Sequence, residues 1–458
     1  MDRLEIWRGY DHVGTVIKDG QGRLHLAYDP LYDGHPLSLS IPKDFAAEPS
    51  TVSNYLDGLL PDSFFIRSRW ANHFRVREDD TLGLLAAVGE EAPGAFQFLL
   101  PGEEPNEGGV DPISDSDVAE RIRILRLDKS RWLPQSHAGQ FSLAGTQAKF
   151  ALQLQGDGSW GLPWGLEATT HILKPATSRD FESIDSVEAI TLDAARRVGI
   201  DVPKSHWTKF GNYTTLVTKR YDRVEVNGQT VRIHQEDFCQ VLGLHTDKKY
   251  TSSGGPNASD LLRVIREHSL APDVDSQEFV RTLAFNHAVR GTDAHAKNYS
   301  LLHTDAGVRL APAYDLISFL PYASGQELLG LQSALNVGGQ SKFQRIGEKE
   351  WIKFARSSGA DPDEVLPIVY DVFERAPSAL EDAVNASSND LDPETLDLWV
   401  SRTGASSRLS LPEGLRAPLV TAPKTQARQH EDSGAVWVQA HTRRGVPVEG
   451  HWRKRPQS

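Results

Sequence analysis

Hydrophobic and polar residues alternate with a period of two near the start of the chain, a pattern typical of strands that bury one face. The alternating hydrophobic runs are Leu4 and Ile6, then Val13, Thr15 and Ile17, and, across a turn at 18–22, Leu24, Leu26 and Tyr28. They predict strands joined by a hairpin turn. Residues 53–74 follow a helical pattern that Gly58 and Pro61 interrupt. The segment 101–117 is rich in Gly, Pro and acids, so we place a boundary there.

A second group of strand-like runs lies within residues 118–247. The predicted strands are 150–154, 171–174 and 214–220, and a helix is predicted at 186–198, before Gly199 and Pro203. The dipeptide Asn227-Gly228 between hydrophobic runs predicts a two-residue hairpin turn. Strands that surround one helix indicate a small β-rich lobe.

The pattern becomes helical after a loop of small and polar residues at 251–259. Val280, Leu283, Ala284, His287 and Ala288 fall on one helix stripe, with Ser276 as the expected N-cap. Further helices are predicted at 351–356, 363–374 and 394–401, and a small terminal hairpin at 436–438 and 446–448. The predicted fold is α+β, and its parts are an N-terminal subdomain (1–105), a β-rich lobe (118–247), a helical C-terminal lobe (260–404) and a flexible basic tail (405–458).

Composition narrows the class of protein. The chain has 458 residues, 39% hydrophobic and 24% charged, which fits a globular protein of several domains. The net charge is −13, although residues 415–458 carry a net +5, and an acidic surface disfavours nucleic acid as a direct partner. Neither a membrane-length apolar run nor a signal peptide is found, so we expect a cytoplasmic protein with no membrane contact. The single cysteine, Cys239, excludes an internal disulfide and is expected to be buried.

Candidate chemistry concentrates in a polar loop at 291–298 that follows the Ser276 helix. Asp293 precedes Asn298 by five residues, and Asp315 follows a predicted hairpin. Phosphoryl transfer from ATP needs such a set: one Asp to orient a hydroxyl, and an Asn with a second Asp to hold Mg²⁺. In the same loop, His295 can contact phosphates or hold the loop, and Lys297 can stabilise the transferring charge. Asp and Asn also commonly shape turns, so the Asp–Asn spacing alone would indicate only a turn.

The upstream lobe supplies the remaining parts of a nucleotide site. The small-residue loop 142–149 contains Gly145, which lets backbone N–H groups approach phosphate oxygens. Lys174 ends a predicted strand after this loop, where it can bind the α- and β-phosphates. Glu188 could pair with that lysine, but the sequence alone favours an exposed helix charge. The run 218–223 ends a strand where an inter-lobe hinge would meet adenine, and Asp222 and Arg223 are expected to form local ion pairs.

Taken in order, these features resemble the HipA family of serine/threonine kinase toxins from bacterial toxin–antitoxin modules. The resemblance covers roughly residues 1–400, and its blocks are 55–62 (YLDGLLPD), 94–98 (GAFQF), 142–149 (SLAGTQAK), 171–175 (HILKP), 234–240 (HQEDFCQ), 292–298 (TDAHAKN) and 310–315 (LAPAYD). It implies a two-lobed protein-kinase-like fold with an additional N-terminal subdomain.

The resemblance also implies roles for individual residues. Asp293 would be the catalytic base, Asn298 and Asp315 would bind Mg²⁺, and Ser142 would be autophosphorylated, which expels its loop and switches the kinase off. The implied ATP-binding residues are Ala144, Gly145, Thr146, Gln147, Ala148, Lys149, Lys174, Lys219, Arg220, Tyr221, His295, Ala296, Lys297, Asn298 and Tyr314.

The implied partners are a protein substrate, for which an aminoacyl-tRNA synthetase is one family example, and a small helix-turn-helix antitoxin that would carry the contact with operator DNA. Two departures from the family pattern stand out: Ala148 occupies the place of a glutamate, and the tail after 405 lies outside the resemblance. Two alternatives stay open on the residues alone, a small-molecule phosphotransferase and a non-catalytic co-repressor scaffold.

Overall fold

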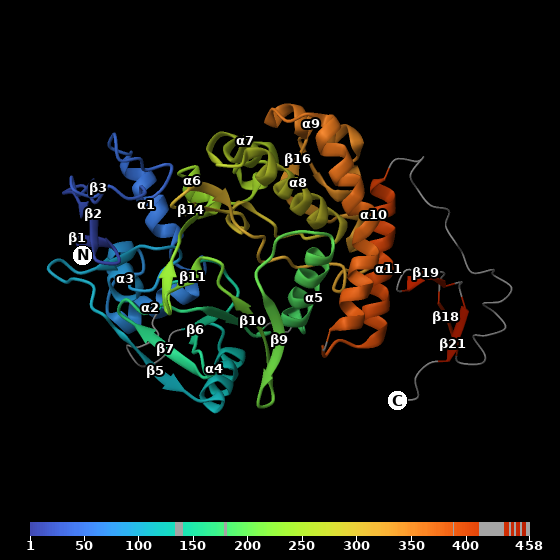
Figure 1. The fold of residues 1–458 in the computed structure, drawn as a ribbon, viewed down its shortest axis with the longest axis horizontal. Helices are drawn as coiled ribbons and strands as arrows, with labels where there is room; N and C mark the ends of the chain where they lie inside the picture. Colours follow the sequence, from blue (N-terminus) through green and yellow to red (C-terminus); the bar gives the residue numbers. More distant parts are fainter. Residues whose placement is uncertain are drawn as a thin grey trace. The chain divides into compact units, whose positions relative to one another are not determined.

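The computed structural model describes residues 1–132, 141–177, 181–387 and 389–411, together with four short strands after residue 434 (Figure 1). Residues Met1–Ser410 form one compact unit, and Leu411–Ser458 form a second. Within the described residues, no helix is long and apolar enough to cross a membrane.

The N-terminal subdomain begins with the predicted strands. They form an antiparallel sheet in the order β3-β2-β1-β4, with bounds β1 Arg3–Arg8, β2 Asp11–Lys18, β3 Leu24–Tyr28 and β4 Gln97–Leu99. Three helices accompany the sheet, α1 Pro49–Gly58, α2 Phe64–Phe74 and α3 Thr81–Val88. The break between α1 and α2 lies at the predicted Gly58 and Pro61, since proline lacks the amide hydrogen that a continuous helix requires.

The second layer is a six-stranded sheet in the order β5-β7-β6-β8-β10-β9. Its strands are β5 Gly109–Ile113, β6 Phe150–Leu154, β7 Trp160–Trp164, β8 His171–Lys174, β9 Ser205–Phe210 and β10 Tyr213–Lys219, with helices α4 Asp115–Leu127 and α5 Ile184–Arg197. The predicted boundary at 101–117 is therefore only partly a linker, because β5 lies inside it and pairs with β7. β5 is an edge strand, the position in a sheet that tolerates the unpaired backbone of Pro112.

These two parts share one hydrophobic core. A single cluster of buried side chains runs from Leu4 in β1 to Val217 in β10. Trp70 of α2 and Trp132, which follows α4, meet edge to face within it, with ring centroids 6.4 Å apart. The N-terminal subdomain is thus packed against the β-rich lobe (118–247).

The C-terminal lobe is mostly helical. Its helices are α6 Phe238–Val241, α7 Ala258–His268, α8 Pro272–Ala288, α9 Glu348–Ser358, α10 Pro362–Ala386 and α11 Pro393–Ser410, and its strands are β13 His234–Asp237, β14 Ser300–Thr304, β15 Gly307–Leu310, β16 Gln332–Val337 and β17 Gln340–Lys342. The hairpin β11 Arg223–Val226 with β12 Gln229–Arg232 has the predicted turn, with Asn227 and Gly228 both at positive φ. The prediction of Ser276 as an N-cap is wrong, because α8 starts one turn earlier, at Pro272.

The end of the chain differs from the prediction in two ways. Helix α11 runs to Ser410, whereas the tail was expected to start at 405, and residues 412–434 of that tail lie outside the described residues. In the second unit, β18 Ala435–Val438 pairs with β21 His451–Lys454, and β19 His441–Arg443 pairs with β20 Val446–Val448. The two predicted strands exist, but each pairs with a neighbour other than the one expected.

Candidate functional site

One cleft of about 550 Å³ brings together nearly all of the predicted site residues. Its lining includes the loop 144–149, Lys174, the run 219–221, and Asp293, His295, Lys297, Asn298, Tyr314 and Asp315. Two predicted residues are not part of this lining. Ala296 is fully buried and donates its backbone N–H to the carbonyl of Lys249, and Ser142 is fully buried beneath the loop.

Lys174 occupies the centre of a buried ion-pair group. At the end of β8, its Nζ lies 2.6 Å from Glu188 Oε1 of α5 and 2.6 Å from Asp315 Oδ1. The expectation that Glu188 is an exposed helix charge is therefore wrong, because only 1% of its side chain is accessible. Helix periodicity did not reveal this, since the partner of Glu188 comes from a strand and not from its own helix.

The charges in this group stabilise one another. Burial opposes the charge of Lys174, but Asp315 and Glu188 raise its pKa above the ordinary value. Burial likewise opposes the charge of Asp315, yet Lys174 and Lys149 lower its pKa to about 2. Burial raises the pKa of Glu188 to about 7. Asp315 also holds the left-handed backbone conformation, with φ at 57°, a strain typical of functional positions.

The loop 142–149 turns tightly at Gly145, where φ is +101°. A Cβ at this position would stand 2.9 Å from Lys149 Nζ, so glycine allows the close approach of that ammonium group. Lys149 Nζ donates to the carbonyl of Ala144 at 2.6 Å and lies over the ring of Trp132. Burial and the nearby Lys174 lower the pKa of Lys149 to about 8. The loop thus presents a cation that, among the described residues, has no carboxylate within ion-pair distance.

The polar loop 291–298 is organised around Asp293. Asn298 Nδ2 donates to the backbone carbonyl of Asp293 at 2.9 Å, and the hydroxyl of Tyr250 donates to Asp293 Oδ1. His295 lies behind this carboxylate, where burial and Lys249 lower the pKa of its imidazole to about 3 and keep it neutral. Its ring packs edge to face against Tyr250, with centroids 5.0 Å apart. His295 therefore supports the loop as a neutral side chain.

Lys297 lines the cleft, but its ammonium group is engaged. It lies 3.0 Å from Asp62 Oδ1 and 3.2 Å from the carbonyl of Gly58, both in the N-terminal subdomain. Asp237 Oδ2 lies 3.8 Å away. These contacts differ from the predicted position on the transferring phosphate.

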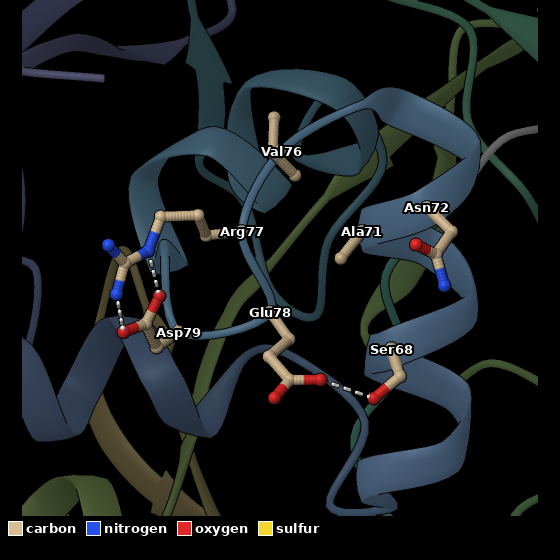
Figure 2. A pocket seen from close by; sticks show the side chains of 7 residues that line it. All are labelled: Ser68, Ala71, Asn72, Val76, Arg77, Glu78 and Asp79. Carbon is tan, nitrogen blue, oxygen red and sulfur yellow. Dashed lines mark hydrogen bonds and ion pairs between the residues drawn. The ribbon is translucent and has the colours of Figure 1, made fainter.

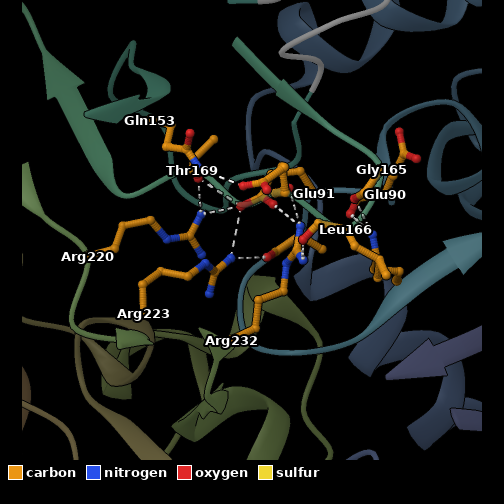
Figure 3. A network of polar contacts seen from close by, with 12 residues as sticks. Glu90, Glu91, Gln153, Gly165, Leu166, Thr169, Arg220, Arg223 and Arg232 are labelled. Atoms are coloured by element: carbon orange, nitrogen blue, oxygen red, sulfur yellow. Dashed lines mark hydrogen bonds and ion pairs between the residues drawn. The ribbon is translucent and has the colours of Figure 1, made fainter. Parts of the chain in front are cut away.

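The hinge run 219–221 lines the cleft, and the side chain of Arg220 points into a buried polar network behind it (Figure 3). Arg220, Arg223 and Arg232 converge on Glu91 of the N-terminal subdomain, at 2.6–2.9 Å. Asp222 pairs with Arg220 and Arg223, as expected. The guanidinium group of Arg220 is thus held by Glu91 and Asp222.

Two tyrosine rings face each other across the hinge. Tyr221 and Tyr314 lie with centroids 5.5 Å apart, and both line the cleft. Tyr314 donates its hydroxyl to the carbonyl of Lys297 at 2.7 Å, which ties the Asp315 segment to the catalytic loop.

Ser142 lies at the base of the phosphate loop, where it is inaccessible to solvent. Its Oγ donates to the carbonyl of Leu59, and its backbone N–H donates to the carbonyl of Glu91 at 2.7 Å. Both acceptors belong to the N-terminal subdomain. Phosphorylation of Ser142 therefore requires this loop to leave its position.

Cys239 is buried, as predicted, and burial raises the pKa of its thiol. A second hollow, of about 390 Å³, lies on the N-terminal subdomain beside α2 (Figure 2). Among its polar groups, Arg77 pairs with Asp79 and Ser68 pairs with Glu78. None of the predicted site residues lines it.

Sequence reasoning did not identify Asp62, Glu91, Lys249 or Tyr250 as site residues. Asp62 belongs to the 55–62 block, which was noted only as a resemblance. Lys249 and Tyr250 form a Lys-Tyr pair directly before the loop at 251–259. The ammonium group of Lys249 and the hydroxyl of Tyr250, next to a loop of small residues, were the sequence signal that could have indicated a site here.

Comparison with known proteins identifies the family. The model of the HipA N-terminal domain matches residues 4–99, and that of the HipA-like C-terminal domain matches residues 141–380. The Y4mE protein of Sinorhizobium fredii is 33% identical over 87% of this chain and 93% of its own length. The serine/threonine-protein kinase toxin HipA of Shewanella oneidensis is 30% identical over 72% of this chain and 78% of its own.

A solved structure supports the same fold. HipA from Shewanella oneidensis, in a complex with HipB and its operator DNA, superposes with a TM-score of 0.76 at 24% identity, over 88% of this chain and 96% of that chain. The two-lobed α+β architecture is thereby confirmed. With both family domains matched in order, the chain belongs to the HipA family of serine/threonine kinase toxins.

Proposed function

We propose that this kinase transfers the γ-phosphate of ATP to a serine or threonine hydroxyl of a protein, with Asp293 as the base. The observation that supports the proposal most directly is the position of Lys174. It bridges Glu188 and Asp315 at 2.6 Å in the cleft that Asp293 also lines. A strand lysine held by a helix glutamate is the arrangement that protein kinases use to bind ATP phosphates.

The basic groups of the cleft would hold the triphosphate. Lys174 stays protonated at all relevant pH values, since its two carboxylates raise its pKa. Lys149 and the backbone of the loop at Gly145 add a second set of donors for phosphate oxygens. The adenine would lie against the hinge run 219–221, near Tyr314.

Asp315 and Asn298 fit the requirements of Mg²⁺. A carboxylate and an amide oxygen are hard donors, and Asn298 uses its Nδ2 on the Asp293 carbonyl, which leaves its Oδ1 for a metal. No group of three His, Cys, Asp or Glu side chains gathers for a metal in the described part of the chain, so phosphate and water oxygens would complete the shell. When bound, Mg²⁺ neutralises charge on the β- and γ-phosphates.

Asp293 would accept the proton of the acceptor hydroxyl. The hydroxyl oxygen then bonds to the γ-phosphorus while the bond to the β-phosphate oxygen breaks, and ADP leaves. Tyr250 engages Asp293 Oδ1, so the second carboxylate oxygen is the one left for the acceptor. A positioned base of this kind contributes about 10²–10⁴ in rate.

Ser142 is the proposed site of self-inactivation. Its Oγ donates to the Leu59 carbonyl in a dry environment, so a phosphate on that oxygen would abolish the bond and add about −1.5 to −2 charges next to a carbonyl. The modified loop could not return to its buried position. The phosphate-binding backbone of Gly145 would leave with it.

Partners follow from the relatives. The related HipA of Shewanella oneidensis forms a complex with HipB and its operator DNA. We propose by analogy a small helix-turn-helix antitoxin as the partner of this chain, with operator DNA bound only through it. The protein acceptor would be cytoplasmic, like the kinase, and an aminoacyl-tRNA synthetase is the first candidate to test.

The test uses γ-phosphate-labelled ATP with the purified protein, alone and with cell lysate. Transfer to protein, with mass-spectrometric detection of phosphate on Ser142, is expected for the wild type, and Asp293→Asn should lose transfer by about 10²-fold or more. Transfer at wild-type rate in Asp293→Asn would overturn the assignment of the base. Label that moves only into small molecules would favour the small-molecule phosphotransferase.

A further inference from the structure

The short turn 58–62 joins α1 to α2 in the N-terminal subdomain and reaches the cleft (Figure 1). We propose that Asp62, the last residue of this turn, is a positioning residue that sets the catalytic loop and the phosphate loop relative to each other. The inference rests on the proposed function, since it assumes that these loops carry the transfer. It assigns to the N-terminal subdomain a part in positioning the groups that carry the transfer.

The carboxylate of Asp62 joins two lysines from different segments of the C-terminal lobe. Its Oδ2 accepts from Lys249 Nζ at 2.7 Å, and its Oδ1 accepts from Lys297 Nζ at 3.0 Å. Only 8% of the Asp62 side chain is accessible. Both carboxylate oxygens are thus used within a nearly dry contact, where an ion pair depends strongly on geometry.

Each lysine is adjacent in sequence to a residue that contacts Asp293. Lys249 precedes Tyr250, whose hydroxyl donates to Asp293 Oδ1. Lys297 precedes Asn298, whose amide donates to the Asp293 carbonyl. A shift of either lysine would therefore move a group that holds the proposed base, and misplacement of about 1 Å can cost about 10²-fold in rate.

The backbone of the turn holds the phosphate loop. The N–H of Asp62 donates to the carbonyl of Gly145 at 3.1 Å, and the carbonyl of Leu59 accepts from Ser142 Oγ. The carbonyl of Gly58 accepts from Lys297 Nζ at 3.2 Å. One turn of five residues therefore contacts both loops between which ATP would bind.

The test compares Asp62→Asn with a matched control, Glu5→Gln. Glu5 is a carboxylate of the same subdomain with the same 8% side-chain accessibility, and it pairs with Arg3 and His12 within the N-terminal sheet. Both substitutions remove a buried charge and keep the side-chain shape, so both are expected to lower the melting temperature.

Only Asp62→Asn is expected to slow phosphoryl transfer. We expect its kcat to fall about tenfold or more, because the lysines lose their shared carboxylate. Its KM for ATP should change less than threefold, since the backbone bond from residue 62 to Gly145 persists. Glu5→Gln should keep kcat within twofold of the wild type, measured on the folded fraction. A kcat for Asp62→Asn within twofold, or an equal loss in both variants, would overturn the proposal.

Lys249→Met provides a second route if Asp62→Asn does not fold. It removes one half of the contact from a side chain that is 13% accessible, and it should also lower kcat while sparing KM. The double variant Asp62→Asn/Lys249→Met should have a kcat only slightly lower than that of Lys249→Met alone, because the two residues act as one unit. Full activity of Lys249→Met would refute the proposal. Asp293→Asn distinguishes a failure of this proposal from a failure of the proposed kinase function. If Asp293→Asn is inactive while Asp62→Asn is fully active, the kinase function stands and only the positioning role of Asp62 is refuted.

Discussion

We expect Lys149 to lower the stability of the ATP-free protein while it strengthens ATP binding, and both effects can be measured. Lys149 is only 8% accessible, and its ammonium group donates a hydrogen bond to the carbonyl of Ala144. Burial and Lys174 lower its pKa from 10.5 to about 8. A lysine whose pKa is lower in the folded state than in the unfolded chain destabilises the fold while it remains charged.

The magnitude follows from that shift. At pH 7 the lysine is charged in both states, and a change from 10.5 to about 8 corresponds to about 3 kcal/mol of destabilisation. Lys149→Met removes this cost and loses about 1 kcal/mol for the hydrogen bond to Ala144. We therefore expect the free energy of unfolding of the ATP-free protein to rise by about 2 kcal/mol at pH 7.

The pH dependence has a definite sign. As pH rises through about 8, wild-type Lys149 loses its proton in the folded state before it does in the unfolded chain, so wild-type stability increases. The methionine variant lacks this titrating group, so its stability does not gain from deprotonation at this position. The stability difference between variant and wild type should therefore shrink by about 2 kcal/mol between pH 7 and pH 9.5.

The assay is urea unfolding at both pH values, combined with ATP titration. Lys149→Met should bind ATP about tenfold more weakly, because a charged donor to phosphate is lost. Lys149→Arg is the control, since arginine stays charged and should show neither the gain at pH 7 nor the recovery at high pH. A methionine variant less stable than wild type at pH 7, or a stability difference that does not change with pH, would refute the reasoning.

Three further substitutions test the remaining parts of the cleft. Lys174→Met should lower kcat/KM for ATP by about 100-fold in steady-state kinetics, since the phosphates lose their cation and two buried carboxylates lose their partner. Asp315→Asn should lose the Mg²⁺-dependent part of ATP affinity, which calorimetry with and without Mg²⁺ would show; an unchanged Mg²⁺ dependence contradicts the assignment. Ser142→Asp should weaken ATP binding in a nucleotide titration, because a charge cannot occupy the buried site at the Leu59 carbonyl, and affinity equal to wild type would contradict the proposed switch.

Short sequence patterns correctly predicted the turns and elements whose conformation depends on neighbouring residues in the chain. The turn at Asn227-Gly228 forms as expected, since both residues tolerate positive φ. The start of α8 was misplaced because the hydrophobic stripe marks a buried face and not a terminus. Pro272 at the first turn was the better signal, since proline is preorganised for that position.

The edge strand β5 was missed for a related reason. Its sequence, Gly109–Ile113, contains the breakers that usually mark a linker. Proline and glycine are disfavoured inside strands, but an edge strand leaves one side of its backbone unpaired and so tolerates a proline. The position of a strand in its sheet is decided by β7, some fifty residues later, and so could not be read from residues 101–117.

In the candidate site, too, short sequence spacings were predictive and contacts between distant segments were not. Asp293, Asn298 and Asp315 were placed from short spacings, and the structure brings all three to one cleft. Glu188 was misjudged because burial of a helix charge depends on which element covers the helix. Its neighbour in space, Asp315, stands more than a hundred residues away in sequence.

The contacts that were hardest to predict from the sequence are those that the N-terminal subdomain makes with the rest of the chain. Glu91 meets three arginines at the hinge, and Asp62 meets two lysines at the catalytic loop. Buried carboxylates add little net stability when paired, yet removing one partner is costly, so such contacts act mainly to fix a geometry. Because one carboxylate sits behind the hinge and the other beneath the catalytic loop, the subdomain constrains both ends of the cleft in which ATP would bind. The hydrophobic core shared from Leu4 to Val217 makes that constraint rigid, since the subdomain cannot shift without disturbing the sheet that carries Lys174.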